Sequence, residues 1–92
     1  MGSLEVISLN VNGLRNPRKR KQIFRKLKEN KLDVICLQET FVTIDVVEQW
    51  EKEWGGELIF NEGTQHEKGQ ITLIRKNLPF SWSVAIRNDR IN

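Results

Sequence analysis

Amide and carboxyl side chains follow two apolar segments of the sequence, at the point where each segment ends. Asn10 and Asn12 end or follow residues 4–10 (LEVISLN), while Gln38 closes residues 33–38 (DVICLQ) and Glu39 comes next. A hard divalent cation such as Mg2+ takes oxygen ligands, often one or two carboxylates with water and substrate phosphate in the remaining positions. Glu39 has the chemistry of such a ligand, and the two asparagines can orient it or hold a phosphate without cancelling the metal's charge.

Each of these residues also has an ordinary interpretation. Asn12 precedes Gly13, and Asn before Gly is common in turns. A glutamate at the end of a strand is often only solvated. On residue types alone, the metal site and the turn remain alternatives.

Positive charge is concentrated in one stretch of the chain. Nine of the fifteen Lys and Arg residues lie between Arg15 and Lys31, against one acid, Glu29, although the net charge of the whole chain is only +3. Two interpretations stay open, a solvated helix face or a surface that contacts a polyanion such as nucleic-acid phosphate. On the second interpretation, the residues that contact backbone phosphates rather than bases are Arg15, Arg18, Lys19 and Lys21.

The first 39 residues are predicted to form a strand, a helix and a second strand. Residues 4–10 are short and rich in β-branched side chains. Asn16 is a good N-cap and Pro17 a good first helical residue, after which Phe24 and Leu27 keep helical spacing while basic residues take the other face. Residues 33–38 form the continuous apolar run that is typical of a strand buried on both faces. The expected unit is βαβ, with its two strands parallel.

Parallel strands bring the polar residues together. In open α/β sheets, ligands collect outside the carboxyl ends of the strands. Those ends carry Asn10 with Asn12, and Gln38 with Glu39. We therefore expect one polar edge of the sheet to hold all four side chains.

The rest of the chain is predicted to add a second helix and antiparallel strands. Thr43 can cap a helix that buries Trp50 and Trp54 and that ends at Gly55. A polar loop covers residues 62–68, and Asn88 with Asp89 indicates a late turn. The predicted strands cover residues 57–61, 70–76 and 81–87. The fold class is α/β, and residues 1–92 make one small domain with a thin core.

Composition bounds the environment of the protein. Its one cysteine, Cys36, lies in an apolar run and is expected to be a small buried side chain rather than a catalytic thiol. The sequence has no apolar stretch of about 18 residues and no signal-peptide pattern. We expect a soluble, intracellular protein without a membrane partner, nuclear if it acts on genomic DNA.

Residues 8–41 carry a two-part motif. Asn-Val-Asn-Gly-Leu-Arg at 10–15 and Leu-Gln-Glu-Thr at 37–40 are separated by a helix-length segment. This pattern resembles the opening of the endonuclease/exonuclease/phosphatase superfamily, and specifically the apurinic-type endonuclease domain of non-LTR (LINE-type) retrotransposons. The stretch WEKEWGGELIFNEG is similar to the same families, whereas KGQITLI departs from the Gly-Val-Ala-Ile-Leu type of segment usual there. The resemblance implies the amino-terminal part of a four-layer α/β sandwich, a βαβ unit followed by a helix and antiparallel strands.

The resemblance also implies roles for the residues of the motif. In the family the Glu of Gln-Glu-Thr binds the divalent metal, Mg2+ or Mn2+, and the first Asn helps position the metal-binding carboxylates and the scissile phosphate. By motif position these catalytic residues are Glu39 and Asn10. Residues beside them, near the phosphate or behind the metal ligand, are Asn12, Gln38 and Thr40. The implied chemistry is hydrolysis of a DNA phosphodiester, in which an Asp activates water, a His assists at the phosphate and the metal offsets developing charge.

Later motifs of the family do not occur in this sequence. The family's catalytic Tyr, its Asp-x-Asn pair and its closing Ser-Asp-His lie further along a domain more than twice this length, and this chain contains no Tyr. Its one histidine, His66, lies in a polar loop with no Asp before it and is expected to be a surface residue. We therefore expect an amino-terminal portion of the nuclease that is inactive alone. Its expected partners are DNA and either the remainder of the domain or a second copy.

Two functions remain open from the sequence. One is part of a retrotransposon DNA endonuclease, whose parent activity is Mg2+-dependent nicking of target DNA. The alternative is a non-catalytic basic module from a degenerate element, which binds nucleic acid or another protein through residues 15–31.

Overall fold

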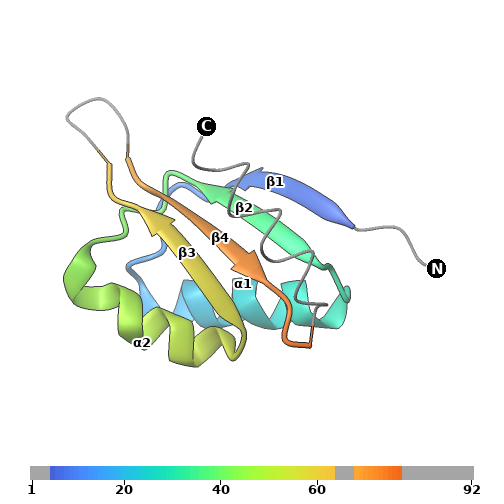
Figure 1. Cartoon of the computed structure of the whole chain (residues 1–92). Coiled ribbons are helices and arrows are strands. Elements are labelled where there is room, and N and C mark those ends of the chain that lie inside the picture. Colours follow the sequence, from blue (N-terminus) through green and yellow to red (C-terminus); the bar gives the residue numbers. More distant parts are fainter. Residues whose placement is uncertain (1–4, 64–67, 78–92) are drawn as a thin grey trace.

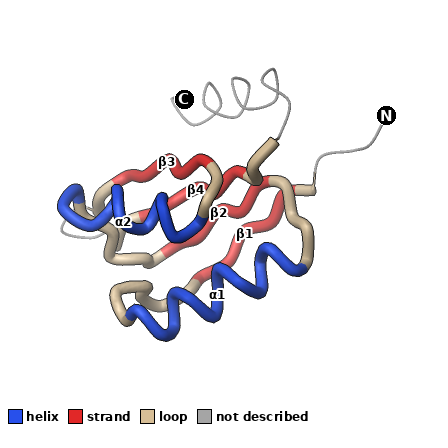
Figure 2. The backbone as a smooth tube through the Cα atoms, turned by 90° about the horizontal axis from the view of Figure 1, so that it is seen from below, coloured by secondary structure: helices blue, strands red, loops and turns tan. Residues whose placement is uncertain are grey.

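A four-stranded sheet with both helices packed on one face forms the body of the protein (Figures 1 and 2). The computed structural model describes residues 5–63 and 68–77. The elements are β1 (Val6–Asn10), α1 (Pro17–Glu29), β2 (Val34–Gln38), α2 (Ile44–Trp54), β3 (Glu57–Asn61) and β4 (Gln70–Ile74). The arrangement confirms the α/β class and matches the amino-terminal part of an α/β sandwich.

The strand order is β1-β2-β4-β3. β1 and β2 are parallel and joined through α1, as the βαβ prediction requires. β4 pairs antiparallel with both β2 and β3 and therefore lies between them. Its residues Ile71, Thr72, Leu73 and Ile74 are all buried. It ends at Ile74, two residues earlier than predicted.

The core lies between the helices and the sheet face that they cover. Its sheet side chains are Ile35, Leu37, Leu58, Ile71 and Leu73. The prediction that both tryptophans belong to the core is confirmed, since Trp50 and Trp54 are buried on α2. Trp54 Nε1 donates a hydrogen bond of 3.0 Å to the carbonyl oxygen of Ile74, which ties the end of α2 to the end of β4.

The two helices begin differently. The Asn16 side chain accepts hydrogen bonds from the backbone N–H groups of Arg18 and Lys19, at 2.9 and 3.1 Å, as its N-cap prediction requires. Thr43 occupies the N-cap position of α2, but its side chain makes no capping hydrogen bond. The first amide of α2, that of Ile44, instead donates to a carboxylate oxygen of Glu62 at 3.0 Å.

One basic residue of α1 departs from the predicted pattern. Arg20 is only 3% exposed, so the expectation that the basic residues all take the solvent face is wrong at this position. Its guanidinium makes two hydrogen bonds to the carboxylate of Glu53 on α2, at 2.6 and 3.0 Å, and another to the Leu14 carbonyl at 3.0 Å. It also lies over the ring of Trp50, 5.0 Å from its centroid. The charge of Arg20 can be buried because a carboxylate and carbonyl oxygens accept its hydrogen bonds. The ion pair with Glu53 joins α1 to α2.

Smaller differences concern Cys36 and the ends of the chain. Cys36, predicted to be buried, is half-buried on the sheet face away from the helices. No helix among residues 5–63 and 68–77 is long and apolar enough to cross a membrane. The predicted strand at 81–87, the turn at Asn88 and the surface assignment of His66 lie outside the described residues.

Candidate active site

The polar edge predicted from the sequence forms where β1 and β2 end. Asn10 and Gln38 are direct partners in the parallel register. Beyond the strands, backbone hydrogen bonds join the two outgoing loops: Val11 N to Gln38 O at 3.0 Å, Gly13 N to Glu39 O at 2.6 Å and Leu14 N to Thr40 O at 3.1 Å. The loops therefore extend the pairing of the strands and fix Asn10 and Glu39 side by side.

The Asn10 side chain connects both halves of the motif. Its Nδ2 donates to Oε2 of Glu39. Its Oδ1 accepts from the backbone N–H of Asn12 at 3.1 Å, which orients the amide with nitrogen toward the carboxylate. Asn10 thus positions Glu39 through one of its two carboxylate oxygens.

The backbone at this edge is left-handed at several residues other than glycine. The φ angles are +52° at Asn12, +56° at Glu39 and +60° at Phe41. Asn tolerates this region, but Glu and Phe enter it at a conformational cost, and such residues cluster at functional sites. The conformation turns the Glu39 side chain out of the strand direction to meet Asn10.

Sequence reasoning missed Lys68, the residue two positions before β4. Its Nζ lies 3.9 Å from Oε1 of Glu39, with 56% of the lysine side chain and 37% of the glutamate side chain exposed. Two backbone hydrogen bonds hold the segment in place, Thr40 N to Gly69 O at 3.1 Å and Phe41 N to Lys68 O at 2.8 Å. The glycine at position 69 was a local signal in the sequence for a turn before β4, and its φ in the structure is +78°.

Of the other predicted site residues, Asn12 and Gln38 are exposed, whereas Thr40 is buried under the loop. Asn12 is exposed beside Asn10. Gln38 Nε2 donates to Ser8 Oγ at 2.8 Å on the sheet face opposite the helices. Thr40 is fully buried, and its Oγ1 accepts from Val42 N at 3.3 Å, so it supports the loop beneath Glu39.

The four basic residues predicted to contact DNA also divide. Arg15 donates to Phe41 O at 3.3 Å and to Thr43 Oγ1 at 3.1 Å, and Lys19 Nζ donates to Val11 O at 2.7 Å and Asn12 O at 3.1 Å. These two hold the loops around the site. Within the described residues, Arg18 and Lys21 are exposed and their side chains have no hydrogen bond or ion pair.

The amino end of α1 is unusually positive. Its first turn contains no acid, and Arg18 and Lys19 lie there beside the positive end of the helix dipole. Cations at this end destabilise a helix by roughly 0.3–1 kcal/mol each, whereas an anion bound there is stabilised. Lys19 in this turn reaches the carbonyl oxygens of Val11 and Asn12, so the positive potential acts on the loop that follows Asn10.

The residues present fit a singly anchored magnesium ion. Glu39 offers one partly exposed carboxylate, and Mg2+ commonly binds proteins through one or two carboxylates while keeping several waters. Among residues 5–63 and 68–77, no group of three or more His, Cys, Asp and Glu side chains can hold a metal ion. Asn10 supplies the supporting hydrogen bond that a ligating carboxylate needs.

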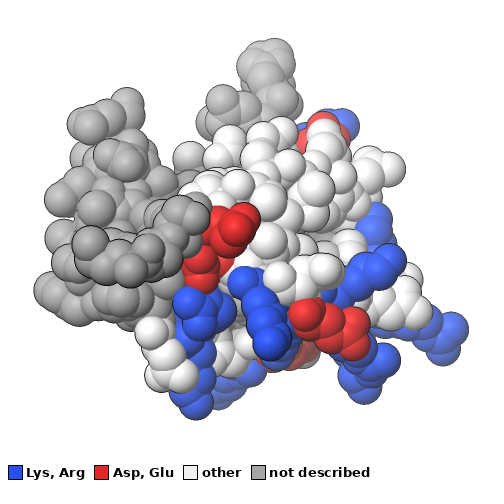
Figure 3. Space-filling model, turned by 90° about the vertical axis from the view of Figure 1, so that its right-hand side faces the viewer, with Lys and Arg blue, Asp and Glu red and all other residues white. Residues whose placement is uncertain are grey.

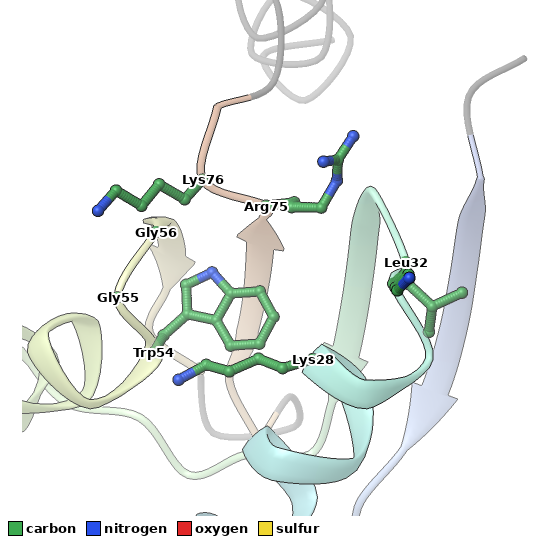
Figure 4. Close-up of a pocket in the computed structure, with 8 residues that line it drawn as sticks. Lys28, Leu32, Trp54, Gly55, Gly56, Arg75 and Lys76 are labelled. Carbon is green, nitrogen blue, oxygen red and sulfur yellow. The ribbon is translucent and has the colours of Figure 1, made fainter. Parts of the chain in front are cut away.

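A hollow lies at the end of the sheet opposite the candidate site, where α1 and β4 end (Figure 4). It has a volume of about 310 Å3, and its basic lining residues are Lys28, Lys31, Arg75 and Lys76. Figure 3 shows this side of the molecule, with Lys and Arg side chains gathered in its lower half. Arg75 is paired with Asp33 at 2.7 Å, and Lys28 lies over Trp54. Trp54, which also lines the hollow, is only 4% exposed.

Comparison with known proteins agrees with the motif. Residues 7–90 match the model of the family described as Endonuclease/Exonuclease/phosphatase family. The chain belongs to this family. The match covers both halves of the site, the Asn10 strand and the Glu39 strand.

The chain is also similar in sequence to a transposon protein. It is 37% identical over 71 residues to the "Transposon TX1 uncharacterized 149 kDa protein" of Xenopus laevis, and the similarity covers 77% of this chain. The aligned region is 5% of that relative. The chain is therefore a member of this family that is similar to a small part of a transposon protein.

Proposed function

We propose that this chain is the amino-terminal part of the DNA endonuclease domain of a LINE-type retrotransposon. The parent activity is nicking of target DNA by Mg2+- or Mn2+-dependent phosphodiester hydrolysis, and it acts in the nucleus on genomic DNA. The observation that carries the proposal is the Asn10–Glu39 pair, presented at the carboxyl ends of two parallel strands. Family membership and similarity to a transposon protein support it.

Each residue has a defined part in the proposed site. Bound to Glu39, the metal would supply electrostatic stabilisation of a phosphate that gains negative charge. Asn10 would keep Glu39 in place for this role by donating to one of its carboxylate oxygens. Lys68 and the positive amino end of α1 attract the same phosphate backbone.

Metal binding is tested directly by NMR titration with Mn2+, whose paramagnetism broadens nearby amide signals. In the unaltered chain we expect broadening to centre on Asn10, Gln38 and Glu39. Glu39→Gln keeps the size of the side chain and removes its charge, and should abolish the effect. The matched control Glu48→Gln removes an exposed charge on α2 and should leave it unchanged. Broadening that survives Glu39→Gln would exclude Glu39 as the ligand.

Catalysis needs more than this half of the site. The sequence contains no Tyr, and its one histidine is His66. The chain alone should therefore leave supercoiled plasmid intact in Mg2+. Metal-dependent nicking that disappears in Glu39→Ala would instead make these 92 residues a complete enzyme.

The alternative function is a non-catalytic basic module that binds nucleic acid. The exposed Arg18 and Lys21 at the amino end of α1 favour DNA contact under either function. Changing both to Gln should flatten the slope of log Kobs against log salt by roughly two units, near 0.9 for each lost phosphate contact. Lys26→Gln with Lys31→Gln, the same charge change near the other end of α1 and just beyond it, is the control.

The two functions differ in what Glu39 does. As part of a nuclease, the chain loses Mn2+ binding with Glu39→Gln while duplex binding persists through the basic residues. As a module without a metal site, the unaltered chain binds duplex DNA and shows no local broadening by Mn2+.

A further inference from the structure

One cross-strand row of the sheet is made entirely of amide side chains. Asn10 pairs with Gln38, Gln38 with Gln70, and Gln70 with Asn61. Directly paired residues point to the same face of a sheet. All four are exposed, and they lie on the face away from the helices, because the intervening Leu37 and Ile71 face the helical core.

The row begins at the candidate active site and continues away from it. Asn10 is committed to Glu39 and to the Asn12 amide, and Gln38 donates to Ser8. In the described part of the chain, the side chains of Gln70 and Asn61 have no hydrogen bond. Gln70 follows Gly69, whose carbonyl accepts from Thr40 N, so Gln70 is joined to the loop that carries Glu39. Asn61 is next to Gln70 in the strand register.

The dimensions suit a stretch of one nucleic-acid strand. Neighbouring strands of a sheet lie about 4.8 Å apart, so four strands span roughly 14 Å. Duplex DNA rises 3.4 Å per nucleotide along its helix axis, so the row matches the axial rise of about four nucleotides.

Neutral amides are also the suitable chemistry beside a metal carboxylate. Additional carboxylates would repel phosphate, and additional cations would compete with the metal for Glu39. Amides donate to phosphate and sugar oxygens and accept from base edges without either effect.

We propose that Gln70 and Asn61 are substrate-positioning residues that contact the sugar-phosphate backbone of the DNA strand held at Glu39. This proposal rests on the proposed function, because it needs duplex DNA at this edge. It adds β4 and β3 to a site that the motif confines to β1 and β2.

The test measures duplex binding by fluorescence anisotropy at several salt concentrations. Asn61→Ala with Gln70→Ala should weaken binding about fivefold to thirtyfold, as the loss of two hydrogen-bonding groups implies. The slope of log Kobs against log salt should stay unchanged, because no charge is removed. Gln49→Ala removes an exposed amide on α2 and should bind as the unaltered chain does.

A second variant guards against loss of folding. Asn61→Val with Gln70→Val removes both amides while favouring strand structure, and should weaken binding to the same extent as the alanine pair.

The outcomes separate the two proposals. If the unaltered chain binds duplex DNA and both double variants bind equally well, the amide row is solvated and only this inference is overturned. A flattened salt slope in the double variants would also overturn it, since the loss would then be of charge contacts. If the unaltered chain binds no duplex even at low salt, the proposed function fails and the role of the row fails with it.

Discussion

The pair formed by Arg20 and Glu53 predicts an asymmetry between two single variants. The Arg20 side chain is 4% exposed, whereas that of Glu53 is 35% exposed. Glu53→Ala leaves a buried guanidinium with only carbonyl oxygens as partners, whereas Arg20→Met leaves a carboxylate that water can reach. Removing the more exposed partner should therefore destabilise the protein more.

The magnitudes follow from burial. Breaking a fully buried pair costs roughly 3–5 kcal/mol, and the exposure of Glu53 and the Leu14 carbonyl bond reduce this to about 3 kcal/mol for Glu53→Ala. Arg20→Met keeps apolar contact with Trp50 and loses hydrogen bonds, at about 1–2 kcal/mol. The control Glu48→Ala breaks the exposed Glu48–Lys52 pair and should cost about 0.3 kcal/mol.

Urea unfolding followed by tryptophan fluorescence measures these differences, because Trp50 and Trp54 are buried in the core. The double variant, Arg20→Met with Glu53→Ala, should be more stable than Glu53→Ala alone, because it removes the stranded charge. If Arg20→Met costs more than Glu53→Ala, or the double variant is the least stable, the assignment of Arg20 as the buried member is wrong.

Three further predictions concern local structure. Hydrogen bonding from the Glu5 N–H, followed by Arg75, holds the pKa of Asp33 below its usual value, so its stabilisation is present above the unfolded pKa and lost as pH falls through the folded one; Asp33→Asn should flatten the acid limb of a pH-stability curve, and an unaltered limb would contradict this. Gly56→Ala should cost roughly 2 kcal/mol or more by overlap with the β4 backbone, against roughly 1 kcal/mol for Gly55→Ala, whose new Cβ meets only the Lys28 Nζ at 4.0 Å and whose φ is +83°; thermal unfolding should rank them in that order. Asn16→Ala should cost about 1 kcal/mol and lower the helical circular dichroism signal, whereas Asn16→Asp should retain the cap.

The parts of the fold that the sequence predicted are those governed by local rules. An apolar run, a capped helix and a second apolar run define a βαβ unit, and parallel strands must bring their carboxyl ends to one edge. The juxtaposition of Asn10 and Glu39 follows from that topology. The hydrogen bond between them fixes an orientation that no spacing rule contains.

The parts that were missed depend on neighbours distant in sequence. Arg20 is four residues before Phe24, so helical spacing could have placed it on the buried face of α1. Its partner Glu53 lies on α2, and the sequence does not indicate that pairing. Lys68 reaches Glu39 because β4 inserts between β2 and β3. Because β3 and β4 are consecutive strands, the sequence predicts that they pair with each other. It does not predict that β4 also pairs with β2.

The structure also changes how the basic segment acts on its surroundings. Arg15 and Lys19 donate hydrogen bonds to carbonyl oxygens of the loops. Arg20 donates to Glu53 on α2. The charge of Arg20 is offset by the Glu53 carboxylate. The charges of Arg15 and Lys19 remain, since a carbonyl orients a cation without neutralising it. The same residues therefore fix the loops around Glu39 and raise the positive potential there, an effect that falls off over a Debye length of about 10 Å at 0.1 M salt. Substituting Arg15 or Lys19 would alter both properties together, whereas the exposed Arg18 and Lys21 report the electrostatic contribution alone.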